Sequence, residues 1–153
     1  MKLYRIAREK YAQDLSGRGG LLTAARWHDH LPVLYTSVQS SSCILEKLVH
    51  LETGEIHHDL QMIEINVPDS ATQLVVDSQD LPQNWNIYPA PRTLAKIGNA
   101  WLTAKGSLLL YVPSVVDPLS QNILINPLHE EVGELKIASI TPFRFDERLY
   151  KMH

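Results

Sequence analysis

The sequence predicts an α+β fold with a mostly β core and two main helices. Three observations predict it. Short apolar or alternating runs bounded by turn residues recur along the 153-residue chain, as in strands. Two longer segments, 40–51 and 92–105, instead carry apolar residues at helical spacing. A composition of 44% hydrophobic and 20% charged residues is typical of a globular protein, and no repeat or linker divides it, so we expect one domain over residues 1–153.

The first expected elements are strands. Residues 2–6 form a short first strand, and residues 11–20 are polar and glycine-rich, which indicates a loop. Residues 33–37 are β-branched and aromatic and lie between Pro32 and a run of serines, so we expect a second strand there.

The first helix is expected over residues 40–51. The serines at 40–42 offer an N-cap and Gly54 a C-terminal end. Its apolar positions form one stripe from which Glu46 is excluded. The stripe consists of Ile44, Leu45, Leu48, Val49 and Leu51.

The second half of the chain predicts one more helix among further strands. Pro91 suits the first turn of a helix over residues 92–105, and Gly106 suits its end. Its inward-facing residues are expected to be Leu94, Ile97, Trp101 and Leu102. The residues 84–91 before it contain aromatic and proline breaks and should be a loop. The strand candidates are 62–67, 74–76, 107–112, 122–125, 136–140 and 143–145, of which 107–112 is apolar throughout and should be central.

Bulk properties exclude several functional classes. The net charge of −3 gives no basic footprint for nucleic acid. Cys43 is the single cysteine, so an internal disulfide is impossible, which fits a reducing compartment. The N-terminal residues lack the apolar region of a signal peptide, and no stretch is long enough to span a bilayer. We therefore expect a cytoplasmic protein with no membrane or nucleic-acid partner.

Five side chains are candidates for chemistry. Arg5 and Arg26 can each grip a phosphate or carboxylate through two hydrogen bonds, although a surface arginine is the commoner case. Tyr35 can stack on a planar heterocycle or form part of the core. Glu46 is either a positioned carboxylate or a solvated residue near a helix N-terminus. Ser114, at a strand end, is either a ligand contact or a turn residue.

Other motifs point less clearly to a function. The histidines at 28–30 and 57–58 suggest metal binding, but cysteine partners and H-E-x-x-H are absent, so we expect loop histidines and no metal. The turn at 17–20, Gly-Arg-Gly-Gly, lacks the Lys-Ser/Thr of a P-loop, and its glycines permit a turn or a close backbone approach. No G-x-S-x-G nucleophile motif is present.

Taken together, these residues resemble the RES-domain family, named for an arginine, a glutamate and a serine. The matching pieces occur in the family's order over nearly the whole chain. They are Tyr4-Arg5-Ile6, Leu15-Ser16-Gly17, Gly19-Gly20, Arg26-Trp27-His28, Pro32-Val33-Leu34-Tyr35, Leu45-Glu46-Lys47-Leu48-Val49-His50, Val112-Pro113-Ser114 and Asn126-Pro127 with His129.

The resemblance implies a fold similar to ADP-ribosyltransferases of the diphtheria-toxin kind. It also implies a toxin of a bacterial toxin–antitoxin pair. Such toxins use NAD⁺ as a substrate, with no prosthetic group, and break its nicotinamide–ribose bond. Water, phosphate or a protein accepts the ADP-ribose. The implied partner is an antitoxin with a Xre-like DNA-binding region, whose C-terminal part blocks the active site.

The resemblance also implies roles for single residues. Glu46 falls on the family's catalytic glutamate and Tyr35 on its active-site tyrosine, and we expect Arg26 to act with them. Arg5 and Arg26 fall on NAD-contacting arginines, and Ser114 on the serine of the name. Tyr35 and Ser114 are therefore also expected to contact NAD⁺. Arg18 is a candidate NAD⁺ contact only through its place in the glycine turn. Two alternatives stay open: a transferase that modifies one protein, and a non-catalytic nucleotide-binding module.

Overall fold

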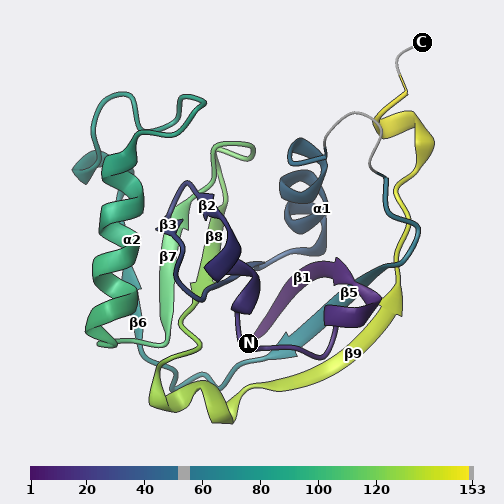
Figure 1. Ribbon diagram of the computed structural model, residues 1–153, viewed down its shortest axis with the longest axis horizontal. Coiled ribbons are helices and arrows are strands. Elements are labelled where there is room, and N and C mark those ends of the chain that lie inside the picture. The colour runs from purple at the N-terminus through teal and green to yellow at the C-terminus, as the bar shows by residue number, and fades with distance from the viewer. Residues whose placement is uncertain (52–55, 152–153) are drawn as a thin grey trace.

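The computed structural model describes residues 1–51 and 56–151. Over these residues it contains two α-helices, a seven-stranded mixed sheet and a two-stranded hairpin (Figure 1). The helices are α1 (Ser40–Val49) and α2 (Arg92–Ala104). The strands of the sheet, in spatial order, are β6 (Gln73–Val75), β7 (Leu109–Pro113), β8 (Gln121–Ile125), β4 (Leu34–Ser37), β1 (Lys2–Arg8), β5 (Leu60–Asn66) and β9 (Lys136–Pro142). The hairpin pairs β2 (Ala24–Ala25) with β3 (His28–Asp29).

The sheet divides into two halves. Strands β1 and β4 share a single register pair, Tyr4 with Ser37, whereas β1 and β5 pair along their full length. One half is therefore β6-β7-β8-β4 and the other is β1-β5-β9, and α1 packs against both β1 and β4 at the junction (Figure 1). The pair β6–β7 is parallel, and α2 lies in the crossover that a parallel connection requires.

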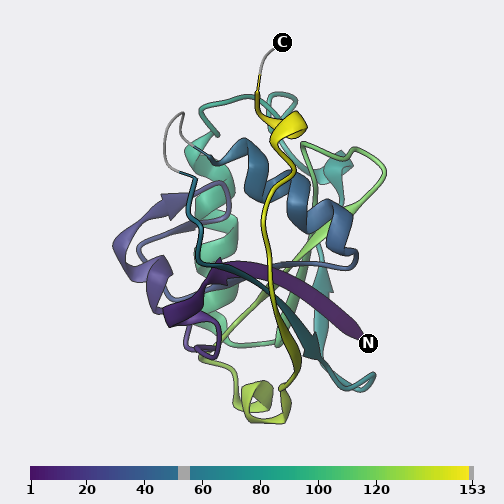
Figure 2. The ribbon, with the colours of Figure 1, turned by 90° about the vertical axis from the view of Figure 1, so that its right-hand side faces the viewer.

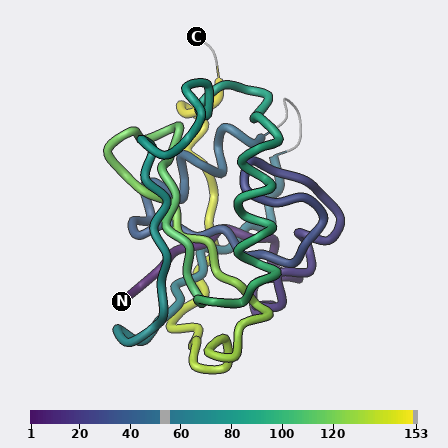
Figure 3. The backbone as a smooth tube through the Cα atoms, turned by 90° about the vertical axis from the view of Figure 1, so that its left-hand side faces the viewer, coloured from purple at the N-terminus to yellow at the C-terminus, as the bar shows by residue number. Residues whose placement is uncertain are grey.

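Helix α2 covers the β6-β7-β8-β4 half of the sheet. Leu94, Trp101 and Leu102 are buried in a cluster with residues of β7 and β8. Gly98 lies against the backbone of the hairpin, because a Cβ at this position would meet the carbonyl oxygen of Trp27 at 1.6 Å. Figure 3 shows the segment around this hairpin running beside α2. The missing side chain therefore fixes how closely the hairpin approaches the helix.

The cluster under α1 joins the helix to the other half of the sheet. Cys43 is buried there with Ile6 of β1, Leu60 of β5 and Phe145. The segment after β9 crosses α1 (Figure 2), and its Phe145 is part of this cluster. In the described part of the chain, no helix combines the length and the hydrophobicity needed to cross a lipid bilayer.

Most predicted elements are confirmed, with ends that differ by at most two residues. Residues 143–145 are not a strand, although the Phe143 N–H still donates to the Leu60 carbonyl. Strand β7 lies between β6 and β8 and is buried, as expected for an interior strand, although it is second from an edge of the sheet. The hairpin β2–β3 was not predicted, because two-residue strands have no detectable periodicity.

The helix ends and faces also differ from the prediction. The N-cap of α1 is Gln39, which makes no side-chain capping bond, rather than one of the serines. Leu45 and Val49 are 39% and 57% exposed, so the apolar stripe of α1 is wrong at these positions, and Ile97 of α2 is also exposed. Lys105, not Gly106, adopts the left-handed conformation that ends α2. The predicted end at Gly54 lies outside the described residues.

Candidate active site

The Glu46 carboxylate lies between α1 and the β7–β8 hairpin. Its Oε1 accepts one hydrogen bond from Ser114 Oγ at 2.7 Å and another from Asn122 Nδ2 at 2.6 Å. Among the described residues, no donor bonds to Oε2. Hydrogen bonds to an ionised acceptor are short and strong, so the two donors hold the carboxylate by one oxygen. The other oxygen can therefore still accept a hydrogen bond.

Ser114 is both a turn residue and a site residue. It is buried, at 3% exposure, directly after β7. While its hydroxyl donates to Glu46, its oxygen accepts the backbone N–H of Asp117 at 3.0 Å. Ser42 of α1 in turn donates to Asp117 Oδ2 at 3.3 Å. The interpretation as a turn residue is therefore confirmed, and the turn is tied to α1. The interpretation as a ligand contact stays a prediction.

Arg26 lies between the two strands of the hairpin. Its Nη1 donates to the carbonyl of Trp85 at 2.5 Å, and its Nη2 donates to the carbonyl of Ile87 at 3.1 Å. Burial lowers the pKa of Arg26, while the nearby Glu46 carboxylate opposes this shift. A guanidinium remains protonated under such a shift. No carboxylate of the described residues forms an ion pair with it, so its positive charge is available to an anion.

Tyr35 of β4 contacts His28 of β3. The phenol oxygen and His28 Nδ1 are 2.8 Å apart, and the rings are tilted by 57°. Burial is the main cause that raises the pKa of Tyr35, and burial also lowers the pKa of His28, so both side chains are neutral near pH 7. The expectation of a loop histidine is therefore wrong for His28, which is 2% exposed and lies in a strand.

Arg5 and Arg18 meet at another residue, Asp14. Arg5 Nη1 donates to the Asp14 carbonyl at 2.8 Å, and Arg18 Nε pairs with the Asp14 carboxylate at 2.6 Å. Burial lowers the pKa of Arg5, and the charge of Asp14 counters this shift. Neither arginine contacts Glu46. The structure thus joins Glu46 to Ser114, places Arg26 within electrostatic reach of both Glu46 and Tyr35, and joins Arg5 and Arg18 at Asp14.

The glycine turn approaches the chain's own backbone. Gly17 has a left-handed φ of 67°, and a Cβ there would lie 2.7 Å from the backbone nitrogen of Val33. A Cβ on Gly20 would lie 2.3 Å from the carbonyl oxygen of Leu31. These glycines therefore pack the turn against the segment that leads into β4.

Two parts of the site were missed by the sequence analysis. Asn122 was assigned only to a strand, although it is the second donor to Glu46. The carbonyls of Trp85 and Ile87, which hold Arg26, lie in a segment assigned only as a loop. A backbone carbonyl has no signature in the sequence. Asn122 did offer a signal, because it is a polar residue at the start of an apolar strand.

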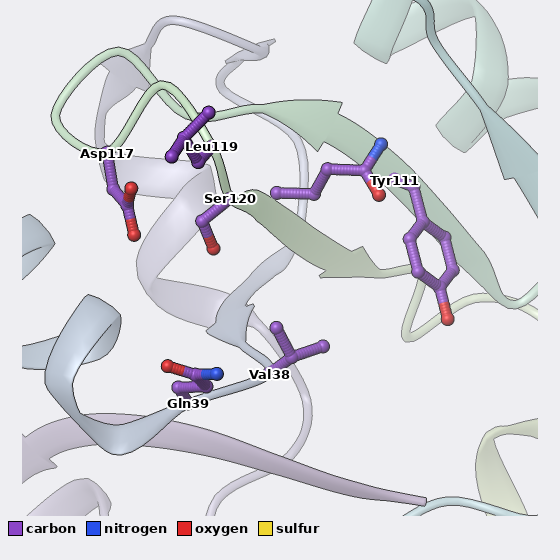
Figure 4. A pocket seen from close by; sticks show the side chains of 7 residues that line it. Val38, Gln39, Tyr111, Asp117, Leu119 and Ser120 are labelled. Atoms are coloured by element: carbon purple, nitrogen blue, oxygen red, sulfur yellow. The ribbon is translucent and has the colours of Figure 1, made fainter.

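A pocket of about 410 Å³ lies beside this network, between the β7–β8 turn and the start of α1 (Figure 4). Its lining residues are Val38, Gln39, Tyr111, Asp117, Leu119, Ser120 and Gln121. In Figure 4, Asp117 and Ser120 point from the turn toward Gln39. None of the predicted site residues lines it. Asp117 links the pocket to the site because its backbone N–H bonds to Ser114.

The histidine motifs do not form a metal-binding group in the described part of the chain, where no three histidine, cysteine or acidic side chains gather. His30 instead pairs with the neighbouring Asp29 at 2.5 Å, and Asp59 pairs with Arg8 at 3.0 Å.

Comparison with known proteins gives consistent results. A family model described as the RES domain matches residues 2–146. Among curated proteins, a Toxin Res of Pseudomonas putida is 37% identical over 98% of this chain and 100% of its own length. A Toxin Res of Yersinia enterocolitica is 36% identical over 97% of the chain and 99% of its own length. The Prs ADP-ribosylating toxin of a Sphingobium species is 33% identical over 95% of the chain and 92% of its own length.

A solved structure supports the fold. A chain of the Mycobacterium tuberculosis MbcT–MbcA toxin–antitoxin complex superposes with a TM-score of 0.73, over 93% of this chain and 83% of that one, at 16% identity. At this identity the likeness concerns the fold alone. It agrees with the mixed sheet and two helices described above. The sequence matches extend over nearly the whole chain, and this protein therefore belongs to the RES-domain family.

Proposed function

We propose that this protein is the enzymatic toxin of a toxin–antitoxin pair and that it consumes NAD⁺ by breaking the nicotinamide–ribose bond. The observation that carries the proposal is the Glu46 carboxylate, held at Oε1 by two neutral donors with Oε2 unbonded among the described residues. Relatives named Toxin Res and Prs ADP-ribosylating toxin, each matched over nearly their full length, support the class of protein.

Cleavage of the nicotinamide–ribose bond needs one carboxylate rather than a pair. Nicotinamide leaves with the electron pair of the broken C–N bond and becomes neutral, so it needs no general acid. Positive charge develops on the ribose, as in the oxocarbenium-like transition state of glycoside cleavage. A fixed negative charge near the ribose stabilises that transition state more than the ground state. With water as the acceptor, the products are nicotinamide, ADP-ribose and a proton.

The remaining site residues have roles in binding. Arg26 has two of its nitrogens on carbonyls and no ion-pair partner in the described part of the chain, which suits contact with the pyrophosphate. Tyr35 is neutral and half-buried, so its ring can pack against the nicotinamide or the ribose. Ser114 acts through Glu46. We propose Arg5 and Arg18, which are joined at Asp14, as a second contact for NAD⁺.

An antitoxin is the proposed protein partner. The MbcT–MbcA structure is a toxin–antitoxin complex, and its toxin-like fold matches most of this chain. We infer that a cognate antitoxin of the Xre kind covers the active site of this protein. Its removal would then be needed before activity is measured.

Transfer of ADP-ribose to a protein is the second candidate, and the name of the Sphingobium relative favours it. The same carboxylate serves both reactions, since they differ only in the nucleophile. Mass spectrometry of proteins incubated with the enzyme and NAD⁺ separates them, because a hydrolase leaves the proteins unmodified.

The test of the function is nicotinamide release from NAD⁺ by the purified, antitoxin-free protein. We expect Glu46→Gln to lower the rate about 10²- to 10³-fold, as for removal of a preorganised electrostatic group. Glu64→Gln, on β5, is the matched control and should retain wild-type activity. Equal turnover by wild type and Glu46→Gln would refute the role of Glu46, and NAD⁺ binding without turnover would identify a non-catalytic module.

A further inference from the structure

Asn122 is the donor to Glu46 that neither the sequence motifs nor the family's name includes. We propose that Asn122, oriented by Ser37, is a positioning residue that fixes the Glu46 carboxylate at Oε1 and reserves Oε2 for the substrate. This inference rests on the catalytic role proposed for Glu46.

The hydrogen-bond pattern fixes the orientation of the Asn122 amide. An ionised carboxylate only accepts hydrogen bonds, so the NH₂ group must face Glu46. The amide oxygen then faces Ser37, whose hydroxyl donates to it at 3.2 Å. Turning the amide around would bring its oxygen against the Glu46 carboxylate, so that two acceptors would face each other there. Ser37 itself is buried, at 3% exposure.

The backbone around Asn122 is held on both sides. Asn122 is paired with Ser37 on β4 and with Val112 on β7, so its strand lies between two neighbours at this level of the sheet. Ser114, the other donor, follows the same β7 strand. Both donors thus belong to one hairpin, and together they can hold a single oxygen in place.

The choice of donors preserves the charge of the carboxylate. An arginine or lysine at the same distance would neutralise Glu46 by forming an ion pair. An amide and a hydroxyl instead restrict its rotation and leave its negative charge for the developing cation of the substrate. Asn122 therefore acts on the reaction through the position of Glu46, without a reacting atom of its own.

The test compares Asn122→Ala with the nearly isosteric Asn122→Asp in NAD⁺ turnover. We expect Asn122→Ala to lower kcat about ten- to hundredfold, as for the loss of a hydrogen bond to a charged group, with KM changed less than about threefold. Asn122→Asp should be worse, because it places a second carboxylate against Glu46. Asn66→Asp, at the exposed end of β5, introduces the same charge as a control and should keep wild-type kcat.

If Asn122 had only a structural role, Asn122→Asp would be more active than Asn122→Ala, because aspartate keeps the shape of asparagine and still accepts the hydrogen bond from Ser37. Wild-type kcat in Asn122→Ala, or higher activity in Asn122→Asp than in Asn122→Ala, would overturn the inference.

A second measurement separates this inference from the proposed function. In an NMR spectrum of the wild type, one side-chain amide proton of Asn122 should resonate downfield and move upfield in Glu46→Ala. An unchanged signal would overturn the inference even in an active enzyme. A shifted signal in a protein that does not cleave NAD⁺ would support the positioning of the carboxylate and refute the proposed function.

Discussion

Gly98 makes a sharp prediction about how α2 supports the site. In Gly98→Ala the new Cβ would begin 1.6 Å from the carbonyl oxygen of Trp27, whereas real Cβ contacts essentially never fall below 3.0 Å. The helix and the hairpin must therefore separate by about 1.4 Å or more. The Cβ is fixed to the helix backbone and the carbonyl belongs to the hairpin backbone, so no flexible side chain can absorb the movement.

The magnitude follows from two opposing terms. Overpacking of a core contact costs about 1–3 kcal/mol and sometimes more. Alanine regains up to about 1 kcal/mol of helix propensity over glycine. A backbone clash lies at the upper end of the first range, so we expect a net loss of about 2 kcal/mol in the free energy of unfolding. For a chain of this size, that loss lowers Tm by about 4–8 °C.

The assay is thermal and urea unfolding of Gly98→Ala beside Gly106→Ala. Gly106 is the matched control, because a Cβ there meets nothing within 4 Å. Since Trp27 follows Arg26 directly, we also expect NAD⁺ turnover by Gly98→Ala to fall in proportion to the fraction of the protein that is unfolded. A Tm equal to or above that of wild type in Gly98→Ala would refute the reasoning.

Two further predictions concern buried titratable groups. Burial lowers the pKa of His28 from its usual 6.5. Between 6.5 and the lowered pKa, the unfolded chain therefore binds more protons than the folded protein. The stability that His28 contributes is lost as the pH falls through this window. The stability difference between wild type and His28→Gln, measured by urea unfolding, should shrink from about pH 7.5 to about pH 5.5; a constant difference would contradict it. Burial raises the pKa of Cys43 to about 11, so iodoacetamide at pH 8 should label the urea-unfolded chain about a hundredfold faster than the native protein. Equal labelling rates would show that the thiol is accessible in the fold.

The sequence was sufficient for elements with strong local signals. Helix α2 has buried residues at Leu94, Trp101 and Leu102, whose spacing is helical, and its observed start at Arg92 is the predicted one. Strands with alternating or continuous apolar residues were also located. The strand prediction for residues 143–145 was wrong because their two phenylalanines pack under α1 without pairing as a strand. Apolar content alone does not distinguish a strand from a packed loop.

The site could be predicted only in part. Glu46 and Ser114 were candidates from their positions, and the family resemblance gave them roles. The structure adds that they touch across 68 residues of sequence. Asn122 and the carbonyls that hold Arg26 depend on which loops and strands meet in space. Such contacts have no local pattern, so a single sequence cannot give them.

The face of α1 explains why periodicity misjudged this helix. Leu45 and Val49 are four residues apart and share an exposed face. Ser42 and Glu46 are also four residues apart, and both bond to the segment 114–122, to Asp117 in one case and to Ser114 and Asn122 in the other. A rule that assigns apolar residues to the interior therefore predicts the exposed face to be buried and the Ser42–Glu46 face to be exposed. The helix thus turns Ser42 and Glu46 toward the β7–β8 hairpin, and such a departure from the apolar pattern is expected where a functional site lies.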